Sequence, residues 1–182
     1  RKYGKLAVVH FDAHPDTWDT EFGEQKFSHG TPFRRAIEQR LIDTSAYIQI
    51  GIRGPTSGQQ DYEDALALGA RMITIDEAMG LGLGRILKEI KDRVQGKPLY
   101  ITLDIDSLDP AFAPGTGTPE VGGFSSYQLL HMLRGLRGLN LVGFDLVEVS
   151  PPFDHSNITS ILASNLVFEF LSLLALNKLN AK

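Results

Sequence analysis

Apolar positions along the chain follow two alternating patterns. Short, nearly continuous apolar runs, typical of strands buried on both faces, occupy residues 6–11, 47–52, 72–75, 99–105 and part of 139–149. Between and after them, apolar residues recur every three or four positions, which predicts helices over residues 31–41, 59–68, 86–94, 125–136 and 159–176. This alternation favours a mostly parallel sheet covered by helices on both faces, a three-layer α/β/α fold within one domain over residues 1–182.

Two of the predicted helices have recognisable starts. Thr31 precedes Pro32, so we expect the threonine to cap the helix and the proline to occupy its first turn. Ser125 is followed three residues later by Gln128, a spacing typical of a capping box.

Composition narrows the class of protein. The chain has 182 residues, 42% of them apolar, and a net charge of −4 without a basic patch, so we expect no nucleic-acid partner. It contains no cysteine, which excludes disulfides, thiolate metal sites and a cysteine nucleophile, and is consistent with a cytoplasmic location. No uninterrupted apolar run approaches the roughly 18 residues of a membrane span, so we expect no membrane association.

Acidic residues and histidine gather where predicted strands end. They are Asp12, His14 and Asp16 after the first strand, Asp104 and Asp106 at the end of the fourth, and Glu148 at the end of the fifth. Ligands of open parallel sheets bind beyond the carboxyl ends of the strands. Residues two apart on a strand point the same way, so Asp104 and Asp106 are expected to converge.

Such crowding of carboxylates indicates a metal site. Neighbouring carboxylates repel one another and take up protons unless cations neutralise them. Oxygen ligands with a little imidazole suit Mn²⁺ and related ions, and two ions bridged by carboxylates generate a hydroxide nucleophile near neutral pH.

Simpler interpretations exist for single residues. An aspartate after a strand is more commonly a turn former than a ligand. Without a motif, His29 would be a surface loop histidine and Glu148 a salt-bridge partner. His10 lies inside an apolar run, which favours a packed, hydrogen-bonded core histidine.

Four segments together resemble a known family. The segments "HFDAHPDT", "SHGTPF", "DIDSLDPAFAPGTGTPEVGG" and "DLVEVSPP" occur in the order found in the ureohydrolases, which include arginase, agmatinase and the guanidino-acid hydrolases. The second and fourth are closer to the agmatinase and guanidinobutyrase branch. The resemblance implies an arginase/deacetylase-like α/β/α fold and a site with two Mn²⁺ ions, for which Ni²⁺ or Co²⁺ are alternatives.

The resemblance also implies a role for each site residue. Asp12 and Asp104 would bridge the two ions. Asp16 would complete the ligands of one ion, and His14 and Asp106 would complete those of the other. Asp106 would accept the proton of the attacking water. His29 would bind substrate and shuttle a proton, and Glu148 would hold the guanidinium group. The glycines of "PGTGTPEVGG" would shape the loop beneath the site.

The family motifs extend beyond this chain. The resemblance implies a further metal-ligand histidine in a glycine-rich motif before Arg1, so we expect the chain to be the C-terminal part of a longer one. We expect agmatine to be converted to putrescine and urea, with 4-guanidinobutanoate or another guanidino compound as the alternative. We expect substrate specificity to be determined by residues 18–27 and 151–158, together with Arg53. A homo-oligomer, trimer or hexamer, is also implied.

Two other functions stay open at this point. A zinc deacetylase-like amidohydrolase shares the architecture but needs one ion and neither Asp16 nor Glu148. A non-catalytic partner subunit would lack the ligand that lies outside the chain. Counting metals and measuring urea release would separate these alternatives.

Overall fold

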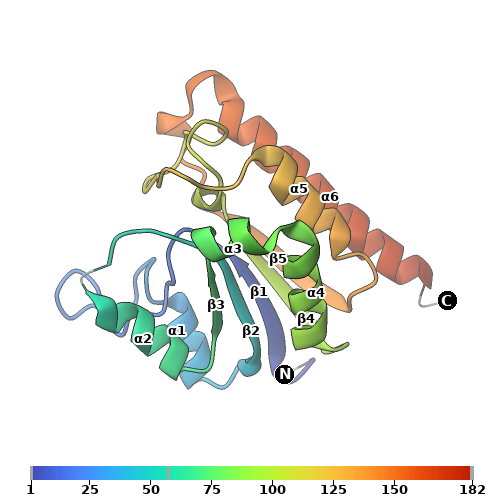
Figure 1. The fold of residues 1–182 in the computed structure, drawn as a ribbon, viewed down its shortest axis with the longest axis horizontal. Helices are drawn as coiled ribbons and strands as arrows, with labels where there is room; N and C mark the ends of the chain where they lie inside the picture. The colour runs from blue at the N-terminus through green and yellow to red at the C-terminus, as the bar shows by residue number, and fades with distance from the viewer. Residues whose placement is uncertain (1, 57, 181–182) are drawn as a thin grey trace.

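The fold is built on a five-stranded parallel sheet. The computed structural model of the chain describes residues 2–56 and 58–180 (Figure 1). The strands are β1 (Leu6–Phe11), β2 (Ile42–Ile52), β3 (Arg71–Thr74), β4 (Leu99–Asp104) and β5 (Leu141–Val147). They pair in the order β3-β2-β1-β4-β5. The carboxyl ends of β1, β4 and β5 therefore lie next to one another, as the sequence predicted.

Helices cover both faces of the sheet. They are α1 (Pro32–Glu38), α2 (Gln59–Ala67), α3 (Ile75–Leu81), α4 (Leu83–Val94), α5 (Ser126–Gly135) and α6 (Ile158–Asn180). Successive side chains of β1 point to opposite faces of the sheet. Val9 therefore joins the large core with α3 to α6, whereas Val8 packs on the other face with residues of α1 and β2. In Figure 1, α1 and α2 lie to the left of the strands, and α5 and α6 run together along the right. The predicted three-layer architecture is confirmed.

Several element boundaries differ from the prediction. The helix expected over residues 31–41 ends at Glu38, because Arg40 turns the chain with a φ of 58°. The strand expected from residue 47 begins at Ile42, whose polar neighbours hid its pairing with Leu6. Helix α3 was missed, although Thr74 caps it by accepting the backbone N–H of Glu77.

Of the two predicted helix starts, one is confirmed and one is wrong. Ser125 and Gln128 form the expected capping box at the start of α5. Thr31 does not cap α1 through its side chain. Its hydroxyl instead accepts the backbone N–H of Ser28 at 2.9 Å and contacts the Lys26 carbonyl oxygen at 3.0 Å. The threonine thus closes the loop that carries His29.

The route of the chain after β4 also differs from the prediction. The strand ends at Asp104, and residues Ile105–Ser107 form a single 3₁₀ turn. Asp104 and Asp106 therefore do not share one strand face. The Asp104 carboxylate caps the turn by accepting the backbone N–H of Asp106 at 2.9 Å, and this turn still brings both carboxylates to the same edge.

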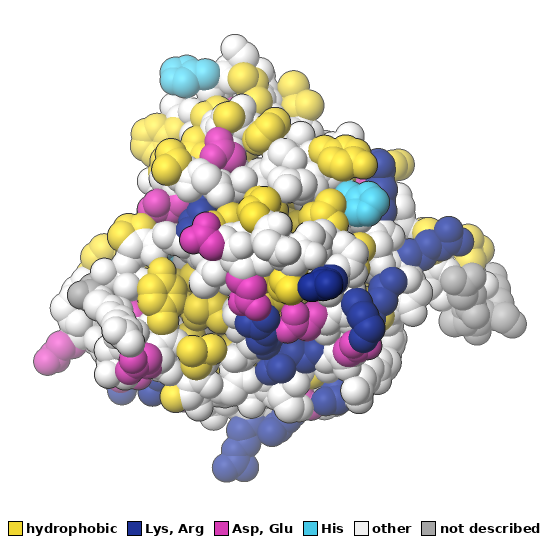
Figure 2. Space-filling view, viewed as in Figure 1, with side chains coloured by type: hydrophobic (Ala, Val, Ile, Leu, Met, Phe, Trp, Pro, Cys, Tyr) yellow, Lys and Arg dark blue, Asp and Glu magenta, His cyan; other side chains and the backbone are white. Residues whose placement is uncertain are grey.

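Helix α6 combines a buried and an exposed apolar face. Leu166 and Phe170 are buried, and Phe170 stacks on Phe144 of β5, whereas Phe168 is 65% exposed. Residues His155–Leu179 have the length and hydropathy of a membrane span, a test that core helices of soluble proteins also meet. Figure 2 shows apolar side chains gathered over the upper part of the molecule, with acidic and basic side chains interspersed below.

Candidate functional site

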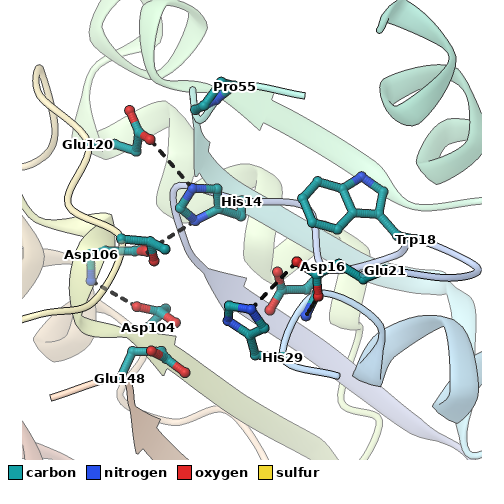
Figure 3. Close-up of a pocket in the computed structure, with 12 residues that line it drawn as sticks. His14, Asp16, Trp18, Glu21, His29, Pro55, Asp104, Asp106, Glu120 and Glu148 are labelled. Atoms are coloured by element: carbon teal, nitrogen blue, oxygen red, sulfur yellow. Dashed lines mark hydrogen bonds and ion pairs between the residues drawn. The ribbon is translucent and has the colours of Figure 1, made fainter. Parts of the chain in front are cut away.

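A cavity of about 250 Å³ opens at the carboxyl edge of the sheet. Its lining consists of His14, Asp16, Trp18, Glu21, His29, Gly30, Pro55, Asp104, Asp106, Thr118, Glu120 and Glu148. All the residues predicted for the site except Asp12 line it (Figure 3), and the Asp12 carboxylate is hydrogen-bonded to the backbone of His14. The two long loops, after β1 and after β4, supply most of this lining.

Asp12, His14 and Asp106 form the tightest part of the site. His14 Nδ1 lies 3.0 Å from Asp106 Oδ2 and 3.5 Å from Asp12 Oδ1. The Asp12 carboxylate also accepts the backbone N–H of His14 at 2.6 Å, and the Asp106 carboxylate accepts that of Ala13 at 3.1 Å. Both acids are 1% exposed. The loop after β1 and the turn after β4 are therefore joined through their acidic side chains.

Asp16 occupies a strained backbone position. Its φ is 50°, in the left-handed region that L residues other than glycine rarely adopt. The Asp16 carbonyl oxygen accepts the backbone N–H of Phe33 at the start of α1. Strain of this kind costs about 1–3 kcal/mol and concentrates at functional sites. It is consistent with a carboxylate placed for binding.

Crowding shifts the protonation of these acids. Burial, reinforced by the negative charges of Asp12 and Asp106, raises the pKa of Asp104 to about 11. Burial and the charge of Asp12 likewise raise the pKa of Asp16 well above its usual range. Without a cation, both carboxyls would thus hold protons at neutral pH.

Asp12 and His14, two further groups of the cluster, are charged. Burial alone would raise the pKa of Asp12, but its interaction with His10 and hydrogen bonds from His14 lower it to about 2. Burial alone would lower the pKa of His14, but hydrogen bonds and charges of Asp106 and Asp12 raise it to about 10. The protonated imidazole of His14 thus supplies the positive charge that a metal cation would otherwise supply to these carboxylates.

The donor atoms fit divalent cations. Ligand atoms of Asp12, His14 and Asp106 all lie within 4.8 Å of one another, and so do those of His10, Asp12 and Asp16. Asp12 belongs to both groups, as a bridging ligand would. Oxygen donors with one imidazole match the preference of Mn²⁺-like ions. Asp104 belongs to neither group but borders both through Asp106 and the cavity.

Glu148 approaches the cavity from the end of β5. Its φ is 63°, a second left-handed residue at the site. The flanking backbone is fixed by a bridge between Val149 and Thr116 and by the Ser150 N–H, which the Gly115 carbonyl accepts at 2.8 Å. Within residues 2–56 and 58–180, no side chain or backbone group hydrogen-bonds or pairs with its carboxylate. The salt-bridge alternative for Glu148 thus finds no partner in this part of the chain.

His29 lies across the cavity from the strand-end acids (Figure 3). Its side chain is 48% exposed, its Nε2 lies 3.5 Å from Glu21 Oε1, and its ring stacks on Phe22 with 5.6 Å between centroids. The Glu21 carboxylate also accepts the backbone N–H of Gly30 at 3.1 Å. Glu21 thus holds both the imidazole and the following peptide.

Arg53, which we expected to help determine the substrate, does not line the cavity. Its guanidinium donates to a set of backbone carbonyls, those of Gly51, Asp106, Ser107, Leu108, Glu120 and Val121. The shortest of these bonds, to Glu120 O at 2.6 Å and Asp106 O at 2.7 Å, tie the two ends of the loop after β4 together. Arg53 therefore orders the loop beneath the site.

The segment 151–158 also has a different role from the one predicted. None of its residues lines the cavity. Asp154 accepts the backbone N–H groups of Thr159 and Ser160, each at 2.8 Å, and so caps α6. Of the two loops expected to choose the substrate, only the one after β1 reaches the cavity in this chain.

Sequence reasoning missed three residues that contact the predicted ligands. The Thr118 hydroxyl donates to Asp106 Oδ2 at 3.2 Å, and Glu120 Oε1 lies 3.7 Å from His14 Nε2. A Cβ on Gly54 would lie 2.3 Å from the His14 ring, so only glycine fits there. Thr118 and Glu120 belong to the glycine-rich motif, in which the resemblance implies a role only for the glycines.

The glycines of that motif largely have the predicted structural role. A Cβ on Gly115 would lie 2.5 Å from the Asp154 side chain, and one on Gly123 would lie 2.6 Å from the Asp109 backbone nitrogen. Gly122 has a φ of 79°. Gly117 differs, since a Cβ there would meet only Glu148 Oε2, at 3.8 Å. It leaves space beside that carboxylate.

Comparison with known proteins gives consistent matches. The model of the arginase family matches residues 1–172. Guanidinopropionase of Pseudomonas aeruginosa is 51% identical over 170 residues, which are 93% of this chain and 54% of that protein. Mitochondrial agmatinase of Gallus gallus is 46% identical over 173 residues, or 95% of this chain and 51% of that protein.

A solved structure gives the same result. Proclavaminate amidinohydrolase from Streptomyces clavuligerus matches with a TM-score of 0.86 and 48% identity, over 94% of this chain and 56% of that one. The chain spans about half the length of the curated relatives it matches.

Proposed function

The chain belongs to the arginase family, and on that premise we propose that its cavity forms part of a dinuclear metal site that hydrolyses a guanidino compound to urea and an amine. The observation that carries this proposal is the cluster of four buried or half-buried aspartates with His14 at one sheet edge. A cluster with raised pKa values on Asp104 and Asp16 needs either protons or cations.

The residues that would hold the ions follow from the two donor groups. Asp16 with Asp12 would hold one ion, His14 and Asp106 with Asp12 the other, and Asp104 would complete the bridge. We propose Mn²⁺, with Ni²⁺ or Co²⁺ able to use the same donors. When bound, such a pair of ions supplies Lewis acidity that lowers the pKa of water and makes a nucleophile available near neutral pH.

Glu148 is the residue that we propose to hold the substrate. A guanidinium carbon is a poor electrophile because its charge is spread over three nitrogens, so it must be fixed in position. A carboxylate without a partner in the described chain accepts charge-assisted hydrogen bonds from those nitrogens. The rigid backbone around Glu148 keeps it beside the acids of β4.

Two residues would move protons. Asp106 Oδ2 faces His14 and the Thr118 hydroxyl, and we propose it as the acceptor of the proton lost by the attacking water. His29, half exposed and held by Glu21, would donate a proton to the departing amine. Its exposure lets it exchange protons with solvent between turnovers.

We propose agmatine as the preferred substrate. No lysine or arginine occurs in the cavity lining of the described residues, whereas Glu21 and Glu120 do. These acids suit the ammonium tail of agmatine, which would yield putrescine. The second candidate is a guanidino acid, because the relative at 51% identity is a guanidinopropionase. The remaining length of the relatives has no counterpart in this chain, and that part of the protein could supply a cation for such a carboxylate.

Assembly and location complete the proposal. The exposed apolar side chains of α6, among them Ile161 and Phe168, are consistent with a homo-oligomer, trimer or hexamer. We propose a cytoplasmic enzyme. Size-exclusion chromatography with light scattering on the full-length protein would measure the assembly, and a monomer would contradict it.

The test is a urea-release assay on the full-length, Mn²⁺-loaded protein with agmatine, 4-guanidinobutanoate, 3-guanidinopropanoate and arginine. We expect release from agmatine above the others. Glu148→Gln should lower kcat/KM for the preferred substrate. The corresponding rise in activation free energy should be about 2–5 kcal/mol, the cost of truncating one partner of a buried charge pair. The matched control is Glu63→Gln, an exposed residue of α2 outside the cavity lining. Absence of urea from every substrate, with metal bound, would contradict the proposal and favour the deacetylase-like or non-catalytic alternatives.

A further inference from the structure

His10 is a buried histidine that the proposed reaction does not use. It lies on β1, is 1% exposed, and its Nε2 is 2.7 Å from Asp12 Oδ2. Its ring packs on Phe33 of α1, with 4.1 Å between ring centroids. Because ligand atoms of His10, Asp12 and Asp16 lie within 4.8 Å of one another, His10 has two possible roles, as a metal ligand or as a residue that positions one.

The hydrogen bonds around His10 decide which nitrogen carries the proton. Gln49 Nε2 lies 2.5 Å from the Pro15 carbonyl oxygen and 3.0 Å from the Tyr47 hydroxyl oxygen. The Pro15 carbonyl oxygen can only accept, so the amide is oriented with its nitrogen toward it and toward the Tyr47 oxygen. The Tyr47 oxygen accepts from Gln49, which leaves the Tyr47 O–H free to donate to His10 Nδ1 at 3.1 Å. His10 then carries its proton on Nε2.

That proton points at Asp12. The donors thus run in one direction, from the Gln49 amide through the Tyr47 hydroxyl and His10 to the Asp12 carboxylate. Neither ring nitrogen of His10 keeps a lone pair directed at the cavity, because Nδ1 accepts from Tyr47 and Nε2 carries the hydrogen. A ligand nitrogen must offer a lone pair to the ion.

We propose that His10 is a positioning residue, which fixes the Asp12 carboxylate as the bridge of the metal pair and is not itself a ligand. This inference rests on the proposed dinuclear site. Partners of this kind, one hydrogen bond away from a ligand, orient the ligand, and their loss weakens metal affinity by about 10- to 100-fold. Gln49 extends the same support to the next turn of the loop, through the Pro15 carbonyl beside Asp16.

The experiment measures Mn²⁺ binding to the full-length protein by electron paramagnetic resonance, which reports the number of ions, their affinity and their mutual coupling. His10→Phe keeps a ring against Phe33 but removes the donor. We expect two ions per chain to remain, with affinity reduced about 10- to 100-fold and an altered coupling signal. His10→Gln places an amide N–H near the former Nε2 and should recover most of the affinity.

A third variant tests the direction of the donors. Tyr47→Phe removes the hydroxyl that fixes the His10 proton, and we expect a smaller loss of affinity than in His10→Phe. Circular dichroism of the metal-free variants checks that each is folded. A drop to one ion in both His10→Phe and His10→Gln would instead make His10 a ligand and overturn the proposal, as would wild-type affinity in His10→Phe. Failure of the wild-type protein to bind two ions would refute the dinuclear site itself, a distinct result.

Discussion

The acids at the ends of β1 and β4 and the loop that carries His29 line the same cavity but are held very differently. Asp12 and Asp106 are 1% exposed and are fixed by hydrogen bonds of 2.6–3.1 Å. His29 is 48% exposed, and its closest charged contact, to Glu21, spans 3.5 Å. The first region lies directly at the ends of the strands, and the second lies within a long loop.

This difference separates two tasks within one cavity. Groups that hold cations must converge to within about 0.5 Å, and groups on rigid strands reach that precision better than groups on loops. A residue that passes protons to solvent and meets a variable substrate tolerates exposure. We therefore expect substitutions in the acid cluster to affect metal binding, and substitutions in the loop that carries His29 to affect turnover alone.

The largest effect is expected for Asp104→Asn in the full-length protein. The substitution removes a charge between the two donor groups, so metal binding and urea release should both be lost, with kcat/KM lower by at least about 10²-fold. The matched control is Asp145→Asn on neighbouring β5. Asp145 accepts the Tyr100 and Thr102 hydroxyls outside the cavity lining, so urea release should stay near wild type. Unchanged turnover in Asp104→Asn would make this aspartate a structural cap only.

An intermediate effect is expected for His29→Asn. Loss of a proton donor lowers kcat by about 10²-fold, the lower end for general acid catalysis. Metal affinity and the unfolding temperature should stay at wild-type values, because in the described chain the His29 ring pairs with Glu21 and stacks on Phe22 and forms no hydrogen bond or ion pair with the acid cluster. A loss of metal from this variant would show that the loop and the acid cluster are not separate.

The last expected effect is a pH dependence of stability in the metal-free protein, which tests the acid cluster without a measurement of turnover. Burial raises the pKa of Asp104 from its ordinary 3.8 to about 11, so the folded state keeps a proton that the unfolded chain releases. His14 acts in the same direction between 6.5 and about 10. The contribution of both groups is present at low pH and is lost as pH rises through these windows.

Denaturant titrations at several pH values, with and without Mn²⁺, measure this dependence. We expect the free energy of unfolding of metal-free protein to fall with rising pH and saturating Mn²⁺ to flatten the curve, since the ion replaces the protons. Stability that rises with pH in metal-free protein would contradict the crowding of these acids.

The sequence predicted the buried parts of the fold better than its exposed connections. The strand Leu6–Phe11 has the predicted bounds because a continuous apolar run has no other stable place than a covered sheet. The start of β2 was missed because residues 43–45 are polar and lie where the pairing register with β1 shifts. Helix α3 was missed because only one turn of its surface is apolar, although Thr74 and Glu77 carried a capping signal.

The site shows the same division. Strand-end acids such as Asp12 and Asp104 could be placed from sequence because parallel strands end at one edge. The roles of Arg53 and Asp154 could not, because a charged side chain in a loop can bind a backbone or a substrate, and only the folded chain decides. Arg53 binds carbonyls and Asp154 caps α6, so neither chooses the substrate.

The most direct test of the central claim is the anomalous diffraction of Mn²⁺ in crystals of the full-length protein. The account predicts two manganese peaks per chain, both in contact with Asp12, with His14 and Asp106 at one and Asp16 at the other. A single peak, or none, with these carboxylates turned away from one another, would contradict it.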